Sequence, residues 1–196
     1  MDSIQGDIDS LLRTRPAGDS EVIEAIVLGY RAPVYRLALS ILNDADEAED
    51  AVQDTFLRAA AAIYRYQVGT NFKAWIYTIA INTCRDYLRK RAARAARDKV
   101  LQAIYTLTEH AHGPEAAAIQ NESRTRLWDL VNQLGEKHRL VVILRLAHNL
   151  TILEISQILE INEKTVYSRL YDAFRKLRQK LTNLPEYENF WLEERS

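Results

Sequence analysis

Apolar residues recur at helical spacing along almost the whole chain, and this periodicity constrains the fold more than any other feature. Within residues 21–30 they fall at Ile23, Ile26, Val27 and Tyr30, which share one face of a helix. No segment alternates as a half-buried strand does, and no internal repeat recurs along the 196 residues. Only 6 glycines and 4 prolines interrupt the chain, which also favours helices over a turn-rich β fold. We therefore predict an all-α protein.

The expected helices group into two small domains joined by a linker. Pro33 suits the first turn of a second helix, and the "NDAD" of residues 43–46 suits a turn that caps a third. A basic, Ala-rich stretch from residue 91, followed by a Gly-Pro break at residues 113–114, indicates a linker whose start can be helical. The predicted parts are a loose or partly helical arm (1–20), a four-helix domain (21–97), a linker (98–121), a second four-helix domain (122–182) and a tail (183–196).

The charges are segregated, although the net charge is only −1. Residues 43–54 hold six acids and no base, whereas residues 85–99 hold seven bases and two acids. Residues 135–181 hold nine bases and five acids. One acidic face and two basic faces therefore carry more information about partners than the average charge does.

The stretch "EISQILEINEKTVYSRLYDAFRKLRQKL" (154–181) reads as two short amphipathic helices joined by a tight turn. We expect Asn162 to cap the second helix, and Glu160 stands in a turn where Gly would be the cheapest residue. The second helix leaves bases, a serine and two tyrosines on its outer face, which suits the major groove of DNA. An ordinary amphipathic hairpin with a solvated basic face is the alternative. The outer residues are Lys164, Tyr167, Ser168, Tyr171, Arg175 and Arg178.

Two further exposed stripes are predicted in the first domain. Asp50, Gln53, Asp54 and Leu57 share one side of a helix and form either a protein-docking face or a solvated acidic flank. A later helix carries amides and bases beside an aromatic loop, a combination that can hold an unpaired nucleic-acid strand. Trp75 lies on the apolar side and is better explained as core. The residues of this second stripe and its loop are Thr78, Asn82, Arg85, Arg89, Tyr66, Asn71, Lys73 and Tyr77.

Several functional classes find no support in the sequence. The single cysteine, Cys84, permits no internal disulfide, and the N-terminus lacks the pattern of a signal peptide, so we expect a cytoplasmic protein. The longest strongly apolar run, "LVVIL" (140–144), is too short to span a bilayer. His110 and His112 lie in the linker and make a poor metal site. We expect no catalytic residues, no metal and no cofactor, since neither a nucleophile–base group nor a Gly-rich phosphate loop occurs.

The acidic "DEAEDAVQDTF" (46–56) and the "AWIYTIAINTCRDYLRKR" (74–91) occur together in the first predicted domain. This block resembles the promoter-melting domain of the extracytoplasmic-function sigma factors, a group of bacterial transcription initiation factors in the sigma-70 family. Residues 133–181, from "QLGEKHR" to the basic end of the helix pair, resemble the C-terminal domain of the same group. The resemblance implies binding to core RNA polymerase and promoter DNA, inhibition by an anti-sigma factor, no membrane insertion and a monomeric free state.

The resemblance also implies roles for particular residues. The acidic stripe would bind core polymerase, the aromatic loop and the following helix would bind the minus-ten element, and the last helix would read the minus-thirty-five element. The implied polymerase-binding residues are Glu49, Asp50, Gln53, Asp54 and Leu57. The implied minus-ten residues are Tyr66, Asn71, Lys73, Asn82, Arg85 and Arg89. The implied minus-thirty-five residues are Lys164, Thr165, Tyr167, Ser168, Arg169, Tyr171 and Arg175.

Two other functions fit parts of the sequence. A stand-alone helix-turn-helix regulator would bind duplex DNA without polymerase and would need no acidic stripe. A protein-interaction module that mimics a sigma factor would not need its basic faces. Transcription initiation is the hypothesis that uses all three surfaces.

Overall fold

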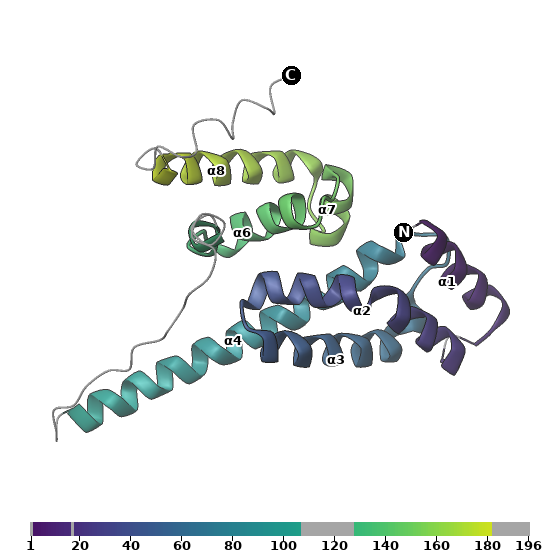
Figure 1. Ribbon diagram of the computed structural model, residues 1–196, viewed down its shortest axis with the longest axis horizontal. Coiled ribbons are helices and arrows are strands. Elements are labelled where there is room, and N and C mark those ends of the chain that lie inside the picture. The colour runs from purple at the N-terminus through teal and green to yellow at the C-terminus, as the bar shows by residue number, and fades with distance from the viewer. Residues whose placement is uncertain (1, 17, 107–127, 182–196) are drawn as a thin grey trace. The chain divides into compact units, whose positions relative to one another are not determined.

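A computed structural model of the chain describes residues 2–16, 18–106 and 128–181, and every element in those ranges is helical (Figure 1). The chain divides into two compact units, Met1–Glu115 and Ala116–Ser196. The predicted all-α class with two helical domains is confirmed. The predicted tail and residues 107–121 of the predicted linker lie outside the described residues.

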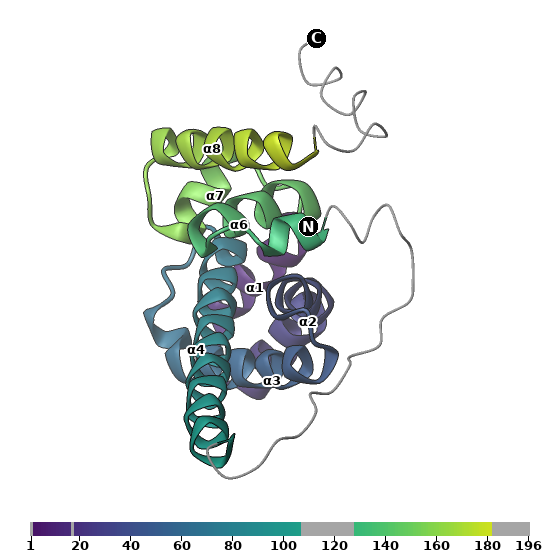
Figure 2. The same ribbon diagram turned by 90° about the vertical axis from the view of Figure 1, so that its left-hand side faces the viewer.

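The first unit contains α1 (Asp2–Thr14), α2 (Ser20–Leu42), α3 (Ala45–Ala62), the 3-10 turn η1 (Ile63–Arg65) and α4 (Phe72–Thr106). Helices α2, α3 and α4 pack against one another, and α1 packs against α2 (Figures 1 and 2). The "NDAD" turn is confirmed: Asn43 ends α2 with φ 53°, and the Asp44 carboxylate accepts a 2.9 Å hydrogen bond from the Glu47 amide at the start of α3. This turn directs α3 back along α2.

Helix α2 corrects one prediction, because the two helices expected on either side of Pro33 are a single helix of 23 residues. A proline inside a helix costs about 3 kcal/mol relative to alanine. Pro33 is itself buried, however, and the buried face continues without a break from Val22 to Leu42. Since each fully buried aliphatic side chain contributes about 1.5–3 kcal/mol, packing outweighs the local preference.

Helix α2 is also long and apolar enough, by length and composition alone, to cross a membrane. Its apolar face is the one that packs in the first unit, where Ile26, Leu37 and Ile41 are at most 2% exposed. A core helix accounts for this composition.

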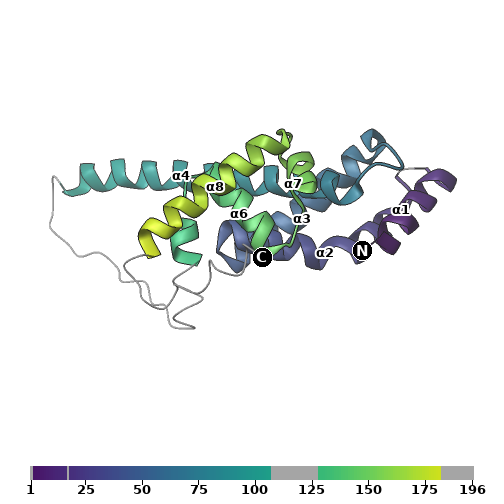
Figure 3. The same cartoon turned by 90° about the horizontal axis from the view of Figure 1, so that it is seen from above.

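Helix α4 continues into the predicted linker, which agrees with the expectation that the linker is helical at its start. The Asn71 side chain accepts a 3.0 Å hydrogen bond from the Ala74 amide at its start, and the helix then runs for 35 residues to Thr106 (Figure 3). It therefore includes the first nine residues of the predicted linker, 98–106. The stretch before them, "RAARAAR" (91–97), is rich in strong helix formers, which explains why the helix continues beyond its packed part.

The second unit contains a helical turn at residues 128–132, then α6 (Glu136–Val142), the π-helical η2 (Ile143–Ala147), α7 (Ile152–Leu159) and α8 (Glu163–Leu181). Helix α8 packs against α6 and α7. The predicted inner residues Ile155, Val166 and Leu170 are buried. The other buried apolar residues of this unit are Val131, Leu134, Leu140, Val141, Val142, Ile143, Leu144, Leu150, Ile158, Ala173 and Leu177.

Candidate functional site

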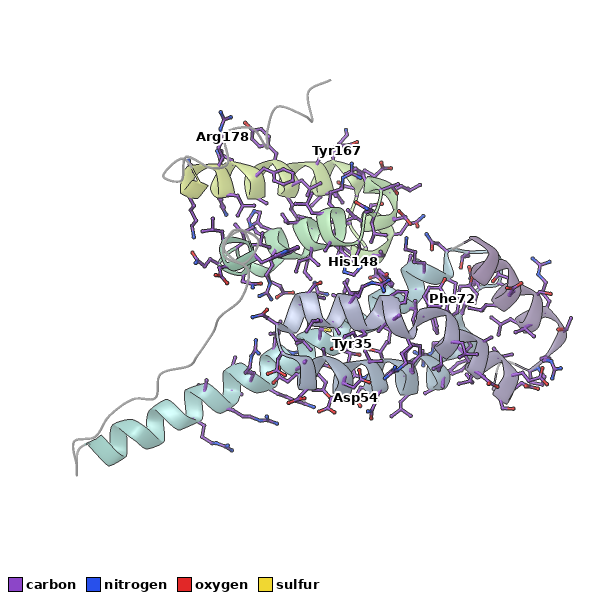
Figure 4. The ribbon with its side chains drawn as sticks, viewed as in Figure 1. Tyr35, Asp54, Phe72, His148, Tyr167 and Arg178 are labelled. Atoms are coloured by element: carbon purple, nitrogen blue, oxygen red, sulfur yellow. The ribbon has the colours of Figure 1, made fainter. Side chains whose placement is uncertain are left out.

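The acidic stripe of α3 is a surface of carboxylate, amide and apolar groups. Asp50 and Gln53 are exposed, Asp54 is half-buried, and 69% of Leu57 is exposed. Figure 4 shows Asp54 on the side of α3 that faces away from α2. An exposed leucine beside acids can contact a protein partner, whereas the negative charge of the acids would repel the phosphates of DNA. Glu49 differs from the stripe, because its carboxylate forms an ion pair with Arg31 of α2.

Side-chain bonds fasten α3 to α4. The Tyr87 hydroxyl donates to Asp54 Oδ2 over 3.1 Å, and Arg58 Nη1 lies 2.7 Å from Asp86 Oδ2. Burial and the hydrogen bond to the Asp54 carboxylate raise the pKa of Tyr87 to about 12, so the tyrosine keeps its proton and remains a donor. The hydrogen bond from Arg58 is the largest of the effects that lower the pKa of Asp86. The acidic stripe is thus held in a fixed position relative to α4.

The loop before α4 rests on an aromatic cluster. Phe72 is fully buried, and its ring centroid lies 4.9 Å from Tyr66, 5.3 Å from Trp75 and 5.3 Å from Tyr30. Trp75 is half-buried in this cluster, which agrees with its interpretation as core. Tyr66 is only 8% exposed, and its hydroxyl lies 3.0 Å from Asp9 Oδ1 and 2.8 Å from the Thr70 carbonyl oxygen. In this conformation Tyr66 supports the loop and does not present its ring to solvent.

The proposed strand-binding residues of α4 lie on its outer side. Asn82 and Arg89 are exposed, while Arg85 and Lys73 are half-buried. Arg85 Nη1 donates to Asn82 Oδ1 over 3.0 Å, which orients the amide of Asn82 beside a cation. Such a pair can offer both hydrogen bonds to a base and charge to a phosphate. The structure thus brings Asn82 and Arg85 together, pairs Arg89 with the Asp86 carboxylate, and gives Asn71 the separate role of helix cap.

The turn between α7 and α8 has the geometry of a helix-turn-helix. Helix α7 begins with a capping box in which Thr151 and Glu154 satisfy each other's backbone amides. Glu160 then adopts the left-handed conformation, φ 53° and ψ 43°, and the Ile161 amide bonds to the Ser156 carbonyl at 3.0 Å. The predicted cap is confirmed, since Asn162 Oδ1 accepts from the Thr165 amide at 2.7 Å. The left-handed conformation of Glu160 also shows why glycine would be the cheapest residue at this position of the turn.

The outer face of α8 carries exposed aromatic and basic groups. Tyr167 is 60% exposed and Tyr171 is 71% exposed, and Figure 4 shows Tyr167 and Arg178 pointing away from α6 and α7. Large aromatic rings remain exposed on this helix although its other face is well packed. The other predicted residues divide by exposure: Lys164, Ser168 and Arg175 are exposed, and Thr165 and Arg169 are half-buried.

Two titratable groups are buried away from these surfaces. Burial raises the pKa of the Cys84 thiol to about 12, which makes it a poor nucleophile. His138 is 7% exposed, and burial, followed by the nearby charge of Lys176, lowers its pKa below the ordinary value. Among the described residues, no group of three or more His, Cys, Asp or Glu side chains could hold a metal ion. His110 and His112 fall outside those residues.

Some residues at these surfaces were missed by reasoning from the sequence. Asp9 contacts Tyr66 from α1, a segment expected to be a loose or partly helical arm. The spacing of Ile4, Ile8, Leu11 and Leu12 is the signal that could have predicted this helix. The Tyr87–Asp54 bond was also missed, because no sequence pattern pairs residues 33 positions apart.

Comparison with known protein families identifies the two helical units. Residues 26–94 match the model for sigma-70 region 2, and residues 124–177 match the model for sigma-70 region 4. These matches fall on the two helical units in chain order and define a sigma-type transcription initiation factor.

Full-length relatives specify the group. The chain is 31% identical over 173 residues to the ECF RNA polymerase sigma factor SigW of Bacillus subtilis, covering 85% of this chain and 92% of SigW. It is 29% identical to the RNA polymerase sigma-H factor of Pseudomonas aeruginosa, over 80% of this chain and 84% of that protein. The chain belongs to the extracytoplasmic-function (ECF) sigma factors.

Solved structures agree with the fold. The chain resembles CnrH, solved in complex with the cytosolic domain of CnrY, with a TM-score of 0.63 and 22% identity over 92% of this chain and 96% of that one. It also resembles the sigma factor RpoE, solved with the anti-sigma factor NepR from Bartonella quintana, with a TM-score of 0.60 and 24% identity over 81% and 96% of the two chains. The family models and the sequence relatives together show that the protein is a promoter-recognising RNA polymerase sigma factor, and a stand-alone regulator is not favoured.

Proposed function

We propose that the three surfaces divide the work of initiation. The stripe formed by Asp50, Gln53, Asp54 and Leu57 docks on core RNA polymerase. The observation that carries this assignment is the exposure of Leu57 among acidic groups on a helix that is fastened to the DNA-binding helix beside it. The same negative charge would repel a phosphate backbone, so the stripe suits a protein partner.

The loop before α4 and the outer side of α4 hold the unpaired strand of the minus-ten element. Asn82 reads a base, and Arg85 and Arg89 neutralise phosphates. Lys73 adds a cation near the start of the helix, and Asn71 and Tyr66 fix the path of the loop. Opening of the duplex follows from differential binding, because contacts to an unstacked base exist only in the open state.

Helix α8 enters the major groove at the minus-thirty-five element. Tyr167, Ser168 and Tyr171 face the base edges, while Lys164 and Arg175 contact phosphates on either side. Arg169 and Thr165 support this face from half-buried positions. The domain limits 21–97 and 122–182 are proposed as the functional boundaries, joined by the segment between them.

The proposed cellular setting follows from the family. We infer that the protein acts in the cytoplasm as a non-catalytic subunit without metal or cofactor, is not inserted in a membrane, and is monomeric when free. An anti-sigma factor is bound to RpoE in its solved structure, and we expect this chain to have a partner of that kind. Native mass spectrometry of the purified chain, alone and after pull-down from its source cells, tests both the monomer and the partner.

Run-off transcription tests the proposed function directly. Purified bacterial core polymerase is supplied with a pool of promoter fragments from the source genome, with and without the protein. Transcripts that appear only with the protein establish initiation and identify the promoter. The absence of both transcripts and polymerase binding would overturn the proposal.

The docking stripe needs variants that spare the fold. Asp50→Ala combined with Asp54→Asn removes both charges, while the Asn oxygen can still accept from Tyr87. We expect loss of polymerase binding with an unchanged melting temperature. Glu24→Ala, which removes an exposed carboxylate from α2, is the control and should bind normally. Equal affinity of the stripe variant and the control would refute docking through α3.

A further inference from the structure

Helix α1 is built into the first unit at the same end as the loop between η1 and α4 (Figures 1 and 3). Ile8 anchors it with a side chain that is only 1% exposed. Asp9 and Arg13 are four residues apart, so they lie on neighbouring turns of one side of the helix. Both side chains approach the loop that is proposed to hold the unpaired strand.

Asp9 controls the position of the loop through Tyr66. The Tyr66 hydroxyl lies within hydrogen-bond distance of both the Asp9 carboxylate, at 3.0 Å, and the Thr70 carbonyl, at 2.8 Å. The hydroxyl has one hydrogen to share between these two acceptors. Burial raises the pKa of Tyr66 to about 12, so this hydrogen is present throughout the neutral range. The contact ties α1 to both ends of the loop, because Tyr66 begins it and Thr70 lies near its end.

Arg13 places a positive charge over the loop. Its Nη2 lies 4.0 Å from the position that a Cβ would take at Gly69, where φ is +90°. Arg13 is exposed, and no ion pair in the described part of the chain involves it. Arg15 is different, because it lies 3.4 Å from Asp19 and 2.8 Å from Glu21 and is neutralised by both carboxylates. A phosphate close to the loop would therefore meet Arg13 and not Arg15.

We propose that α1 is part of the minus-ten surface: Arg13 binds a phosphate of the captured non-template strand, and Asp9 is a positioning residue that holds the loop through Tyr66. This inference rests on the proposed capture of an unpaired base by the loop and α4. A guanidinium can donate two parallel hydrogen bonds to one phosphate, which makes Arg13 suited to fixing the strand over the small Gly69.

The phosphate contact is tested with the full chain in complex with core polymerase. The promoter is the one identified by run-off transcription, with 2-aminopurine in the non-template minus-ten strand to report opening. Arg13→Gln should weaken capture of the matching single-stranded oligonucleotide about tenfold or more, as expected for one lost hydrogen bond to a charged group. The slope of log affinity against log salt should fall by about 0.7 for one phosphate on a single strand. Arg15→Gln is the matched control and should leave both values unchanged.

The positioning role is tested by conservative rescue. Asp9→Ala removes the acceptor, whereas Asp9→Asn retains an oxygen that can accept from Tyr66. Asp9→Ala and Tyr66→Phe should each slow opening by a similar factor without weakening polymerase binding, and their combination should be no worse than either alone. Asp9→Asn should open promoters at the normal rate. A loss of opening that Asp9→Asn does not restore would overturn the positioning role.

Asn82→Ala distinguishes failure of the proposed base capture by α4 from failure of the proposed role of α1. If it impairs opening while Arg13→Gln and Asp9→Ala behave as the wild type, α1 has no part in the surface and the inference is overturned. If Asn82→Ala also opens promoters normally, base capture by α4 is wrong and the role of α1 falls with it. Reduced opening in all three variants, with an unaffected Arg15→Gln, supports the inference.

Discussion

Glu160→Gly should stabilise the second unit, because Glu160 holds a left-handed conformation that only glycine adopts without cost. Its φ is 53°, and the turn cannot relax this angle because the amides of Glu160 and Ile161 bond to carbonyls of α7. The left-handed conformation costs a residue with a Cβ about 1–2 kcal/mol. Glycine loses about 0.5–1 kcal/mol of extra chain entropy on folding. The difference predicts a net gain of about 0.5–1 kcal/mol.

Hydrogen exchange of the full chain measures this gain where it should occur. Backbone amides of α7 and α8 that exchange through unfolding of the second unit should exchange about 2–5-fold more slowly in Glu160→Gly, since 1.4 kcal/mol corresponds to tenfold. The helices of the first unit provide an internal reference and should be unchanged. Glu160→Asn should gain less than glycine, because asparagine tolerates the left-handed region better than most residues but not freely.

Glu160→Ala is the control that isolates the backbone effect. Alanine removes the carboxylate but keeps a Cβ, so it should not stabilise the unit. If alanine stabilised as much as glycine, the cause would be the charge of Glu160 rather than its φ. If glycine gave no protection, the reasoning about the turn would be wrong.

Three other perturbations test the electrostatics of the fold and of α8. The free energy of unfolding of the wild type should fall as the pH is lowered from 7.5 to 5.5. Burial, and then the positive charge of Lys176, hold the pKa of His138 in the folded chain below 6.5, so the unfolded chain binds the proton first. Urea unfolding of His138→Gln should lack this decline. The hydrogen bond from Arg58 is the main cause of the lowered pKa of Asp86 in the folded chain. The stabilisation that it gives should be complete above about pH 4 and lost as the pH falls through that lowered pKa. The free energies of unfolding of Asp86→Asn and the wild type should therefore differ at pH 7 and become equal in acid. Arg175→Ala should reduce the salt slope of duplex binding by about 0.9, and an unchanged slope would remove Arg175 from the interface.

Patterns within one element could be predicted from the sequence. The buried faces of α7 and α8 follow from a 3.6-residue period, and the cap at Asn162 follows from its place before an amphipathic run. These features depend on neighbours in the sequence. The family could be recognised for the same reason, because its two motifs are contiguous stretches.

Features that depend on contacts between distant elements could not be predicted. The helix continues through Pro33 because α2 packs against α1, α3 and α4 and has buried residues both before and after the proline, and no local signal reports that burial. The family resemblance implies that Tyr66 contacts the minus-ten DNA, but its ring packs on Phe72 and Trp75. The partner of its hydroxyl, Asp9, is 57 residues away. Such contacts change the role assigned to a residue without changing the domain to which it belongs.

The bond between Asp54 and Tyr87 limits how this protein can be re-engineered. In this protein the 3.1 Å bond links Asp54, a carboxylate of the proposed polymerase-binding stripe, to the Tyr87 hydroxyl of α4, the proposed DNA-binding helix. Replacing α4 by a helix that lacks Tyr87 would leave Asp54 half-buried and without this hydrogen-bond donor. A change of promoter specificity made in this way would therefore also change the proposed binding to polymerase. The promoter specificity of α4 and the polymerase binding proposed for α3 would have to be redesigned together.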